Sequence, residues 1–243
     1  MIWLEEVDST NAEARRYAHA GETGPVWIAA RRQTQGRGRR GRKWTTGEGN
    51  LAATLLTVTA LPAAQAAGAA FVAALAASDL ASAYVPPGLV TLKWPNDVLV
   101  ARRKACGILV ETGPALAGGI WLAVGVGVNL VSAPHDAERP ATALADHLGP
   151  GRSAPPTPDQ ALVELAAAYG RWNAVWEAGG LAPILEAWTA RAPGIPGACI
   201  ARLPDGTLRG TAEGLDSDGA LRLRLADESL RRITAGDVFF GDR

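Results

Sequence analysis

The sequence predicts an α+β protein with a small β-barrel at its C-terminal end, and three observations support this fold class. Short segments rich in β-branched and aromatic residues recur through the first domain. Alanine-rich segments of helical length lie among them. After the Pro/Gly-rich stretch 192–197 the chain changes to short alternating segments joined by Asp-Gly pairs, which are typical of hairpin turns. We therefore expect a first domain over residues 1–192 and a barrel over residues 197–243.

The N-terminal elements follow from residues that start and end helices. The strand expected at residues 2–7 leads into Asp-Ser-Thr-Asn at 8–11, whose side chains can cap a helix. That helix is expected over residues 12–18 and ends at Gly21. A second strand is expected at residues 26–31.

An uncharged stretch, residues 51–78, has to be distinguished from a membrane span. Alternating residues from Leu51 predict a strand, and Pro62 then starts an alanine-rich helix. Because the residue types switch at Pro62, we expect a buried strand followed by a core helix, and no membrane association. The other elements expected before the barrel are strands at 50–59, 89–94, 98–101, 105–112 and 119–128, a hairpin tip at 102–103, and helices at 142–147, 159–177 and 181–189.

The composition argues against several functional classes. The 243 residues are 48% hydrophobic and carry 24 basic and 24 acidic side chains, so the formal net charge is zero. A dedicated nucleic-acid binder usually shows a broad basic surplus, which is absent here. The chain opens without a basic start or a long apolar core, so no signal peptide is expected and a cytoplasmic location is predicted. The two cysteines lie far apart and form no metal-ligand spacing.

The segment from Gly36 to Trp44 contains four arginines, one lysine and three glycines in nine residues. Its glycines satisfy G-x-G-x-x-G, but loop residues follow Gly41 where a dinucleotide fingerprint requires an apolar helix. Two interpretations of this segment stay open. It is either a solvated basic loop or nucleic-acid patch, or a mobile loop whose arginines neutralise a phosphate ester and whose tryptophan stacks on a base.

Lysine is rare in this chain, and its three occurrences mark three segments. Lys43 ends the basic loop, Lys93 begins Lys-Trp-Pro-Asn-Asp, and Lys104 begins Lys-Ala-Cys-Gly-Ile-Leu-Val-Glu. Because arginine supplies nearly every other cation, a retained lysine suggests a pocket that needs a compact point charge for a carboxylate or phosphate oxygen. The three lysines therefore indicate one site built from three segments.

Four motifs, in this order and spacing, resemble those of the biotin protein ligases. They are the residues at 8–11, the basic loop, the residues at 93–97, and those at 104–111 followed by Gly-Val-Gly-Val-Asn at 125–129. The resemblance covers nearly the whole chain and implies a mixed β-sheet flanked by helices, followed by an SH3-like barrel. It also implies that ATP activates biotin to biotinoyl-5′-AMP, and that the biotinoyl group then passes to one lysine of a biotin carboxyl carrier protein.

The resemblance assigns roles to individual residues. Lys104, Arg39 and Asp97 are the catalytic candidates, because two anions must be brought together by cations that stay fixed while pyrophosphate leaves. The residues expected to bind biotin, whose uncharged ureido ring needs paired donors and acceptors, are Ser9, Thr10, Gln33, Gly36, Arg37 and Gly107. The residues expected at ATP or the adenylate are Arg39, Arg40, Trp44, Lys93, Asn96, Lys104 and Asn129, with Mg²⁺ near Asn96 and Asp97.

Several of these residues also have simpler structural interpretations, and the chain has two alternative functions. Ser9 and Thr10 can be helix caps, Trp94 a core residue, Gly125 and Gly127 positions where strands pack closely, and Glu111 a structural group. A lipoyl- or octanoyl-protein ligase is the related alternative, and it would need a long apolar slot in place of partners for a ureido ring. A nucleic-acid-binding module is the alternative from a different class.

Two further expectations concern partners. Some family members carry an N-terminal helix-turn-helix domain, but here the first strand is expected at residue 2, so no DNA binding is expected. A homodimer is compatible with the resemblance. The barrel contains no lysine and no residue of the four motifs, so we expect it to supply no chemistry and the upstream domain to fold without it. The resemblance implies that such a barrel helps to hold ATP and the carrier protein.

Overall fold

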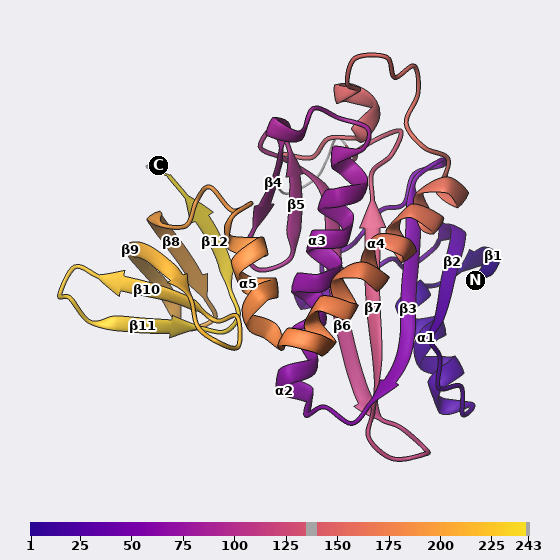
Figure 1. The fold of residues 1–243 in the computed structure, drawn as a ribbon, viewed down its shortest axis with the longest axis horizontal. Coiled ribbons are helices and arrows are strands. Elements are labelled where there is room, and N and C mark those ends of the chain that lie inside the picture. The colour runs from indigo at the N-terminus through magenta and orange to yellow at the C-terminus, as the bar shows by residue number, and fades with distance from the viewer. Residues whose placement is uncertain (135–139, 242–243) are drawn as a thin grey trace.

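The computed structural model describes residues 1–134 and 140–241, and its larger part is built on a seven-stranded sheet (Figure 1). The strand order is β1-β2-β3-β7-β6-β5-β4. Only β1 and β2 run parallel among the neighbouring pairs, so the predicted mixed sheet is confirmed. The strands are β1 (Ile2–Val7), β2 (Val26–Gln33), β3 (Leu51–Thr59), β4 (Val90–Lys93), β5 (Asp97–Val100), β6 (Arg103–Pro114) and β7 (Ile120–Val128).

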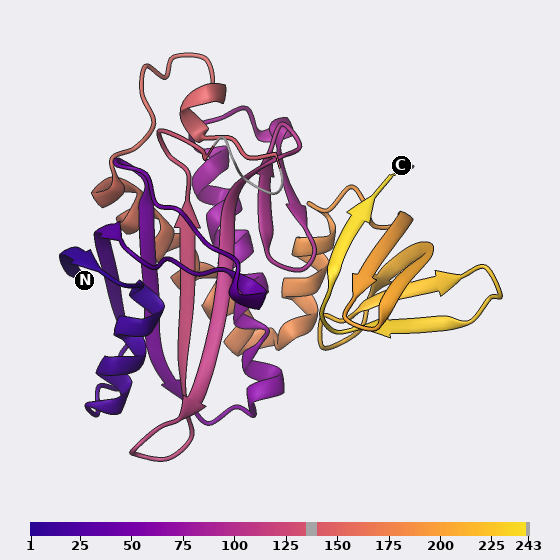
Figure 2. The same ribbon diagram turned by 180° about the vertical axis from the view of Figure 1, so that it is seen from behind.

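Helices cover both faces of this sheet. The helix α1 (Thr10–His19) packs on one face, and α3 (Ala69–Ser82) and α4 (Pro158–Gly179) pack on the other (Figures 1 and 2). The short helix α2 (Ala63–Ala66) precedes α3, and α5 (Leu181–Thr189) follows α4. Three single-turn 3₁₀ helices, η1 (Arg39–Gly41), η2 (Pro87–Leu89) and η3 (Leu144–His147), lie in the connections.

The uncharged stretch forms β3, α2 and α3, as predicted. By length and composition residues 63–82 could cross a membrane, with a mean hydropathy of 1.4. However, 67% of the 18-residue stretch to which this hydropathy refers is buried inside the molecule. The alanines of α3 pack closely against the sheet and α4, because small side chains let helices approach their neighbours. The helix is therefore part of the protein core.

The helix start and the hairpin turn lie within one or two residues of the positions predicted from the sequence. The helix α1 begins two residues earlier than expected, with Ser9 as its N-cap residue. The hairpin between β5 and β6 turns at Ala101 and Arg102, whose φ angles of 47° and 65° give the tight two-residue turn. This tip lies one residue before the predicted position.

The C-terminal part is a five-stranded antiparallel sheet that curls into an open barrel, which confirms the predicted architecture (Figure 1). The strand order is β11-β10-β9-β8-β12. Asp205 and Asp218 precede the glycines of two hairpin turns, as expected from the Asp-Gly pairs. The strands are β8 (Gly197–Leu203), β9 (Gly206–Leu215), β10 (Leu221–Leu225), β11 (Leu230–Ile233) and β12 (Asp237–Phe240).

One hydrophobic core crosses the boundary between the two parts. The indole of Trp94, 2% exposed, donates a hydrogen bond of 2.9 Å to the carbonyl of Gly219. Gly219 also lies against the ring of Phe71, so close that a Cβ at this position would come within 2.4 Å of the ring. Trp94 is thus a core residue, as the simpler interpretation proposed. Deletion of residues 197–243 would uncover Phe71 and Trp94, which counts against independent folding of the upstream part, and the division at 192–197 stays a prediction.

The contact between Gly219 and Phe71 can be tested against a glycine with similar backbone geometry. Gly118 has φ = 92° and no atom within 4 Å of the place that a Cβ would occupy, whereas Gly219 has φ = 85° and the Phe71 ring beside it. We expect Gly118→Ala to lower the free energy of unfolding by about 1 kcal/mol through backbone strain alone. Gly219→Ala should cost about 2–4 kcal/mol because overpacking adds to that strain. Urea unfolding measures both, and equal losses would contradict the packing argument.

Candidate active site

A cavity of about 350 Å³ lies on the α1 face of the seven-stranded sheet, beneath the loop that joins β2 to β3. In Figure 2 this loop, with η1, crosses in front of the sheet. The volume falls in the range of small-molecule sites. The predicted site residues that line the cavity are Ser9, Thr10, Gln33, Arg37, Arg39, Arg40, Trp44, Asn96, Asp97, Lys104, Gly107 and Asn129. Segments far apart in sequence therefore meet around one cavity.

The floor of the cavity is a row of small residues that runs across four strands. In the sheet register Asp97 of β5 pairs with Gly107 of β6, Gly107 pairs with Gly127 of β7, and Gly127 pairs with Ala52 of β3. Paired residues point to the same face of a sheet, so this row leaves a trough bounded at one end by Asp97. Gly125 opens the next row. These glycines leave space above the sheet, so their role is not limited to the close packing of strands that the simpler interpretation proposed.

Trp44 and Asn11 occupy part of that room. A Cβ on Gly127 would lie 2.4 Å from the indole nitrogen of Trp44, and one on Gly125 would lie 2.1 Å from the amide oxygen of Asn11. Gly107 lies under the edge of the same indole, and a Cβ on Gly107 would lie 3.0 Å from the ring. The loop and the start of α1 can therefore descend onto the sheet only because these positions lack side chains.

The basic loop closes on itself at its base. The backbone N–H of Trp44 donates to the carbonyl of Gly36 at 2.9 Å, and Gly38 N–H donates to the carbonyl of Arg42 at 2.7 Å. A Cβ on Gly36 would come within 2.3 Å of the Trp44 carbonyl oxygen. Gly36 does not line the cavity; it lets the two ends of the loop meet, and its expected place beside biotin stays a prediction.

Polar side chains form a network at the start of α1. The side chain of Ser9 makes no capping hydrogen bond, although Ser9 is the N-cap residue, and it lines the cavity. Gln33 accepts from the backbone N–H of Thr10 at 2.9 Å, and its amide donates to Thr46 at 3.0 Å. The hydroxyl of Thr54 lies 2.8 Å from that of Thr10. Thr10 and Gln33 therefore line the cavity in orientations that hydrogen bonds fix, beside the hydroxyl of Ser9.

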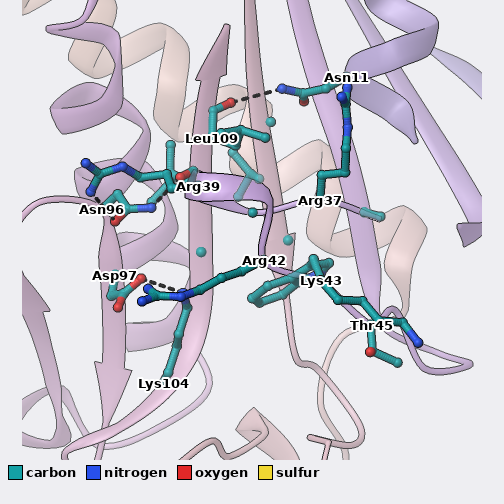
Figure 3. A pocket seen from close by; sticks show the side chains of 18 of the residues that line it. Asn11, Arg37, Arg39, Arg42, Lys43, Thr45, Asn96, Asp97, Lys104 and Leu109 are labelled. Carbon is teal, nitrogen blue, oxygen red and sulfur yellow. Dashed lines mark hydrogen bonds and ion pairs between the residues drawn. The ribbon is translucent and has the colours of Figure 1, made fainter. Parts of the chain in front are cut away.

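Cations and their partners line the other end. The ammonium of Lys104 lies 2.6 Å from a carboxylate oxygen of Asp97, whose side chain is 6% exposed (Figure 3). The guanidinium of Arg39 donates to the amide oxygen of Asn96 at 3.3 Å, and Asn96 donates to the carbonyl of Ile108 at 2.6 Å. Burial lowers the pKa of the Arg39 guanidinium from its usual value. Such partly desolvated cations in fixed positions are suited to binding anions.

Cys106 lies in β6, and Asn129 directly follows β7. Asn129 is buried at the end of β7, where its amide donates to the carbonyl of Thr142 at 3.1 Å. Burial raises the pKa of the Cys106 thiol to about 12, so the sulfur stays protonated at neutral pH. Cys106 is therefore a small core residue and not a nucleophile.

The residues near Asn96 can contribute only part of a metal site. Among residues 1–134 and 140–241 no group of three or more His, Cys, Asp or Glu side chains could hold a metal ion. Asp97 supplies a carboxylate, but one of its oxygens contacts Lys104. The amide oxygen of Asn96 faces Arg39. This donor set fits a Mg²⁺ ion that is held mainly by phosphates and water.

Lys93 pairs with Asp97 in the register of β4 and β5, so both side chains point to the same face of the sheet, and the expected place of Lys93 at the phosphates stays a prediction. Lys93 does not line the cavity, and its ammonium lies 5.2 Å from the ring centre of Phe239 in β12.

Two other residues of the site had no assigned role. Asn11 lines the cavity and donates to Glu111 at 2.8 Å, although the sequence indicated only a helix cap. Asp237 also lines it, from the barrel that was expected to supply no chemistry. Asn11 belongs to the 8–11 motif, which could have indicated it, but no local signal marks Asp237.

Comparisons with known proteins agree with this geometry. A model of the biotin/lipoate A/B protein ligase family matches residues 3–129, and a model of the biotin protein ligase C-terminal domain matches residues 198–241. The biotin–[acetyl-CoA-carboxylase] ligase of Paracoccus denitrificans is 41% identical, covering 98% of this chain and 99% of that protein. A ligase of the same description from Mycobacterium tuberculosis is 32% identical, covering 97% and 86%.

A solved structure shows the same fold. The biotin protein ligase from Aquifex aeolicus in complex with biotin and ATP aligns with a TM-score of 0.78 at 22% identity, covering 99% of this chain and 98% of that one. Fold and site thus define an enzyme of the biotin and lipoate ligase class. The chain belongs to the biotin protein ligases, because the matched C-terminal domain and both full-length relatives are of that family. The lipoyl and octanoyl ligase alternative is not supported.

The glycine floor predicts how the loop is held. Gly127→Ala would place a methyl group where the Trp44 indole lies, so the loop should lift from the sheet. Hydrogen–deuterium exchange of peptides covering residues 36–46 should then be about tenfold faster than in the native chain. Gly214→Ala is the matched control, since this strand glycine has open space around it. Unchanged protection in Gly127→Ala would contradict the packing of Trp44 on the floor.

Proposed function

We propose that this chain activates biotin with ATP and transfers the biotinoyl group to a lysine of a biotin carboxyl carrier protein. In the first step a biotin carboxylate oxygen bonds to the α-phosphorus of ATP, and pyrophosphate leaves. In the second step the carrier amine bonds to the acyl carbon, loses a proton, and AMP leaves. The observation that supports this proposal is one cavity lined by uncharged polar side chains at one end and by cationic side chains at the other.

Lys104 is the proposed cation between the biotin carboxylate and the α-phosphate. Its ammonium is held by Asp97 at 2.6 Å and lies 5.5 Å from the centre of the Trp44 ring. A charge that is already positioned needs little reorganisation when the anhydride forms. Asp97 is proposed to orient Lys104 in this step, and then to orient or deprotonate the incoming carrier amine.

Arg37, Arg39 and Trp44 are the proposed cover of the adenylate. Arg39 is fixed at Asn96, and Arg37 lies 3.7 Å from a carboxylate oxygen of Glu111. Trp44 supplies an aromatic face for the adenine, and Asn129 supplies an amide near it. Arg40 is also proposed to contact the adenylate, although its guanidinium lies 3.4 Å from the carboxylate of Asp237 in the barrel.

The uncharged end is the proposed biotin pocket. Ser9, Thr10 and Gln33 offer hydroxyl and amide groups. Gly107 lies beside the Lys104 ammonium, and we place it where the biotin carboxylate would approach the backbone of β6. A ureido ring needs donors and acceptors together, which these side chains can supply, whereas the apolar chain of a lipoyl group makes no use of them. The pocket therefore favours biotin.

Mg²⁺ is proposed to arrive with ATP and to neutralise phosphate charge near Asn96 and Asp97. The homodimer, the absence of DNA binding and the cytoplasmic location stay predictions from the sequence. The decisive experiment is ATP–pyrophosphate exchange with biotin, with lipoate and with neither. Exchange that depends on biotin alone supports the proposal, and exchange that depends on lipoate overturns the substrate assignment.

Lys104→Ala tests the central cation. We expect biotin-dependent pyrophosphate exchange to fall by about 10²–10³, the usual cost of losing one fixed charge at such a site. Lys104→Arg is the matched variant, because it restores the charge without the compact geometry, and we expect it to recover only part of the rate. Thermal denaturation checks the fold, since Asp97 loses its contact with the ammonium in Lys104→Ala. Near-normal exchange in Lys104→Ala would show that the assignment is wrong.

Arg39→Gly tests the cover. We expect the adenylate to form but to escape sooner, because the loop loses its contact with Asn96. Escaped adenylate would label lysines of bystander proteins, which a streptavidin blot detects. Arg102→Gly, at an exposed hairpin tip outside the cavity, is the control. Bystander labelling no higher than that of the native chain would count against this role of Arg39.

A further inference from the structure

The barrel reaches the cavity through the first residue of β12. The carboxylate of Asp237 accepts a hydrogen bond of 2.9 Å from Arg42, and its second oxygen also contacts the Arg42 guanidinium. The same second oxygen lies 3.4 Å from Arg40. One carboxylate of the C-terminal part therefore binds two arginines of the loop that covers the cavity.

The position of Asp237 is fixed by the strand that carries it. β12 pairs with β8, with Asp237 opposite Arg202, and the next residue, Val238, is buried in the shared core. Phe239 lies between two cations, with Arg202 at 4.5 Å and Lys93 at 5.2 Å from its ring centre. The side chain of Asp237 is only 15% exposed. A carboxylate held this rigidly can act as an anchor for a loop.

The loop divides its arginines between two directions. Arg37 and Arg39 contact groups on the sheet, Glu111 and Asn96, whereas Arg40 and Arg42 contact Asp237. A two-oxygen contact between arginine and carboxylate fixes direction as well as distance. All four arginines line the cavity, and the barrel holds two of them.

We propose that Asp237 is a positioning residue that latches the basic loop closed over the reaction intermediate. This inference rests on the proposed adenylation. When the Asp237 carboxylate is neutralised, two neighbouring guanidinium groups lose a shared anion and repel each other. The loop then opens more often and the adenylate escapes before transfer. The barrel therefore contributes to retention of the intermediate, although it does not touch the reacting atoms.

The test compares Asp237→Asn, which removes the charge at nearly constant shape, with the native chain. Two readouts are used: the rate of tryptic cleavage within residues 36–44 in the free protein, and the rate at which preformed adenylate is released. We expect each rate to rise about tenfold, a size that suits a partly exposed charged hydrogen bond. The pyrophosphate exchange kcat should change less, because Lys104 and Arg39 remain in place.

Control variants separate latching from a general loss of stability. Glu213→Gln removes a barrel carboxylate that pairs with Arg224 away from the cavity, and should leave both rates unchanged. Asp237→Glu keeps the charge and should recover both rates to within about threefold of native, which a purely structural role would not predict. Arg42→Gln combined with Asp237→Asn should release adenylate no faster than the worse single variant.

The outcomes distinguish this inference from the proposed function. Unchanged cleavage and release in Asp237→Asn, failure of Asp237→Glu to recover them, or additive effects in the double variant would each overturn the latch. Absence of biotin-dependent exchange in the native chain would overturn the proposed function instead. The tryptic readout needs no ligand, so it tests the latch in either case.

Discussion

Repulsion among the cations of the basic loop is the constraint on which the site depends. Five cationic side chains lie between positions 37 and 43, and such a segment has no reason to adopt one conformation by itself. Groups from three distant segments oppose this repulsion: Glu111 on β6, Asn96 between β4 and β5, and Asp237 on β12. Both the sheet and the barrel therefore contribute groups that hold the loop, in addition to the backbone hydrogen bonds that close its base.

The glycine row provides the space into which this loop descends. Gly107 and Gly127 face each other across β6 and β7, and Trp44 packs above them. The same absence of side chains leaves backbone accessible beside the fixed charge of Lys104. Packing of the loop and access for a ligand thus have one structural cause. This explains why the glycines and the charged residues occur in the same motifs.

The hydrophobic core shared by the two parts links the position of the barrel to the position of cavity residues. Trp94 and Phe71 pack against the turn at Gly219, and β12 carries Asp237 to the cavity from the same barrel. Trp94 directly precedes the turn that presents Asn96 and Asp97. The position of the barrel and the position of these polar residues are therefore determined by one packed interface. A change in this interface should affect the loop and the nucleotide side together.

The sequence by itself determined the element order and most of the site. Period-two alternation, helix-starting residues and Asp-Gly turns are local signals, so the sheet, the core helix and the hairpins could be predicted. Cavity residues such as Lys104 and Trp44 lie within continuous motifs, so they could be recognised before their geometry was known. Only the tertiary structure decided where Gly36, Lys93 and Asp237 lie. Their roles depend on contacts between segments, and Asp237 reaches the loop from about two hundred residues away along the chain, a separation that no local pattern records.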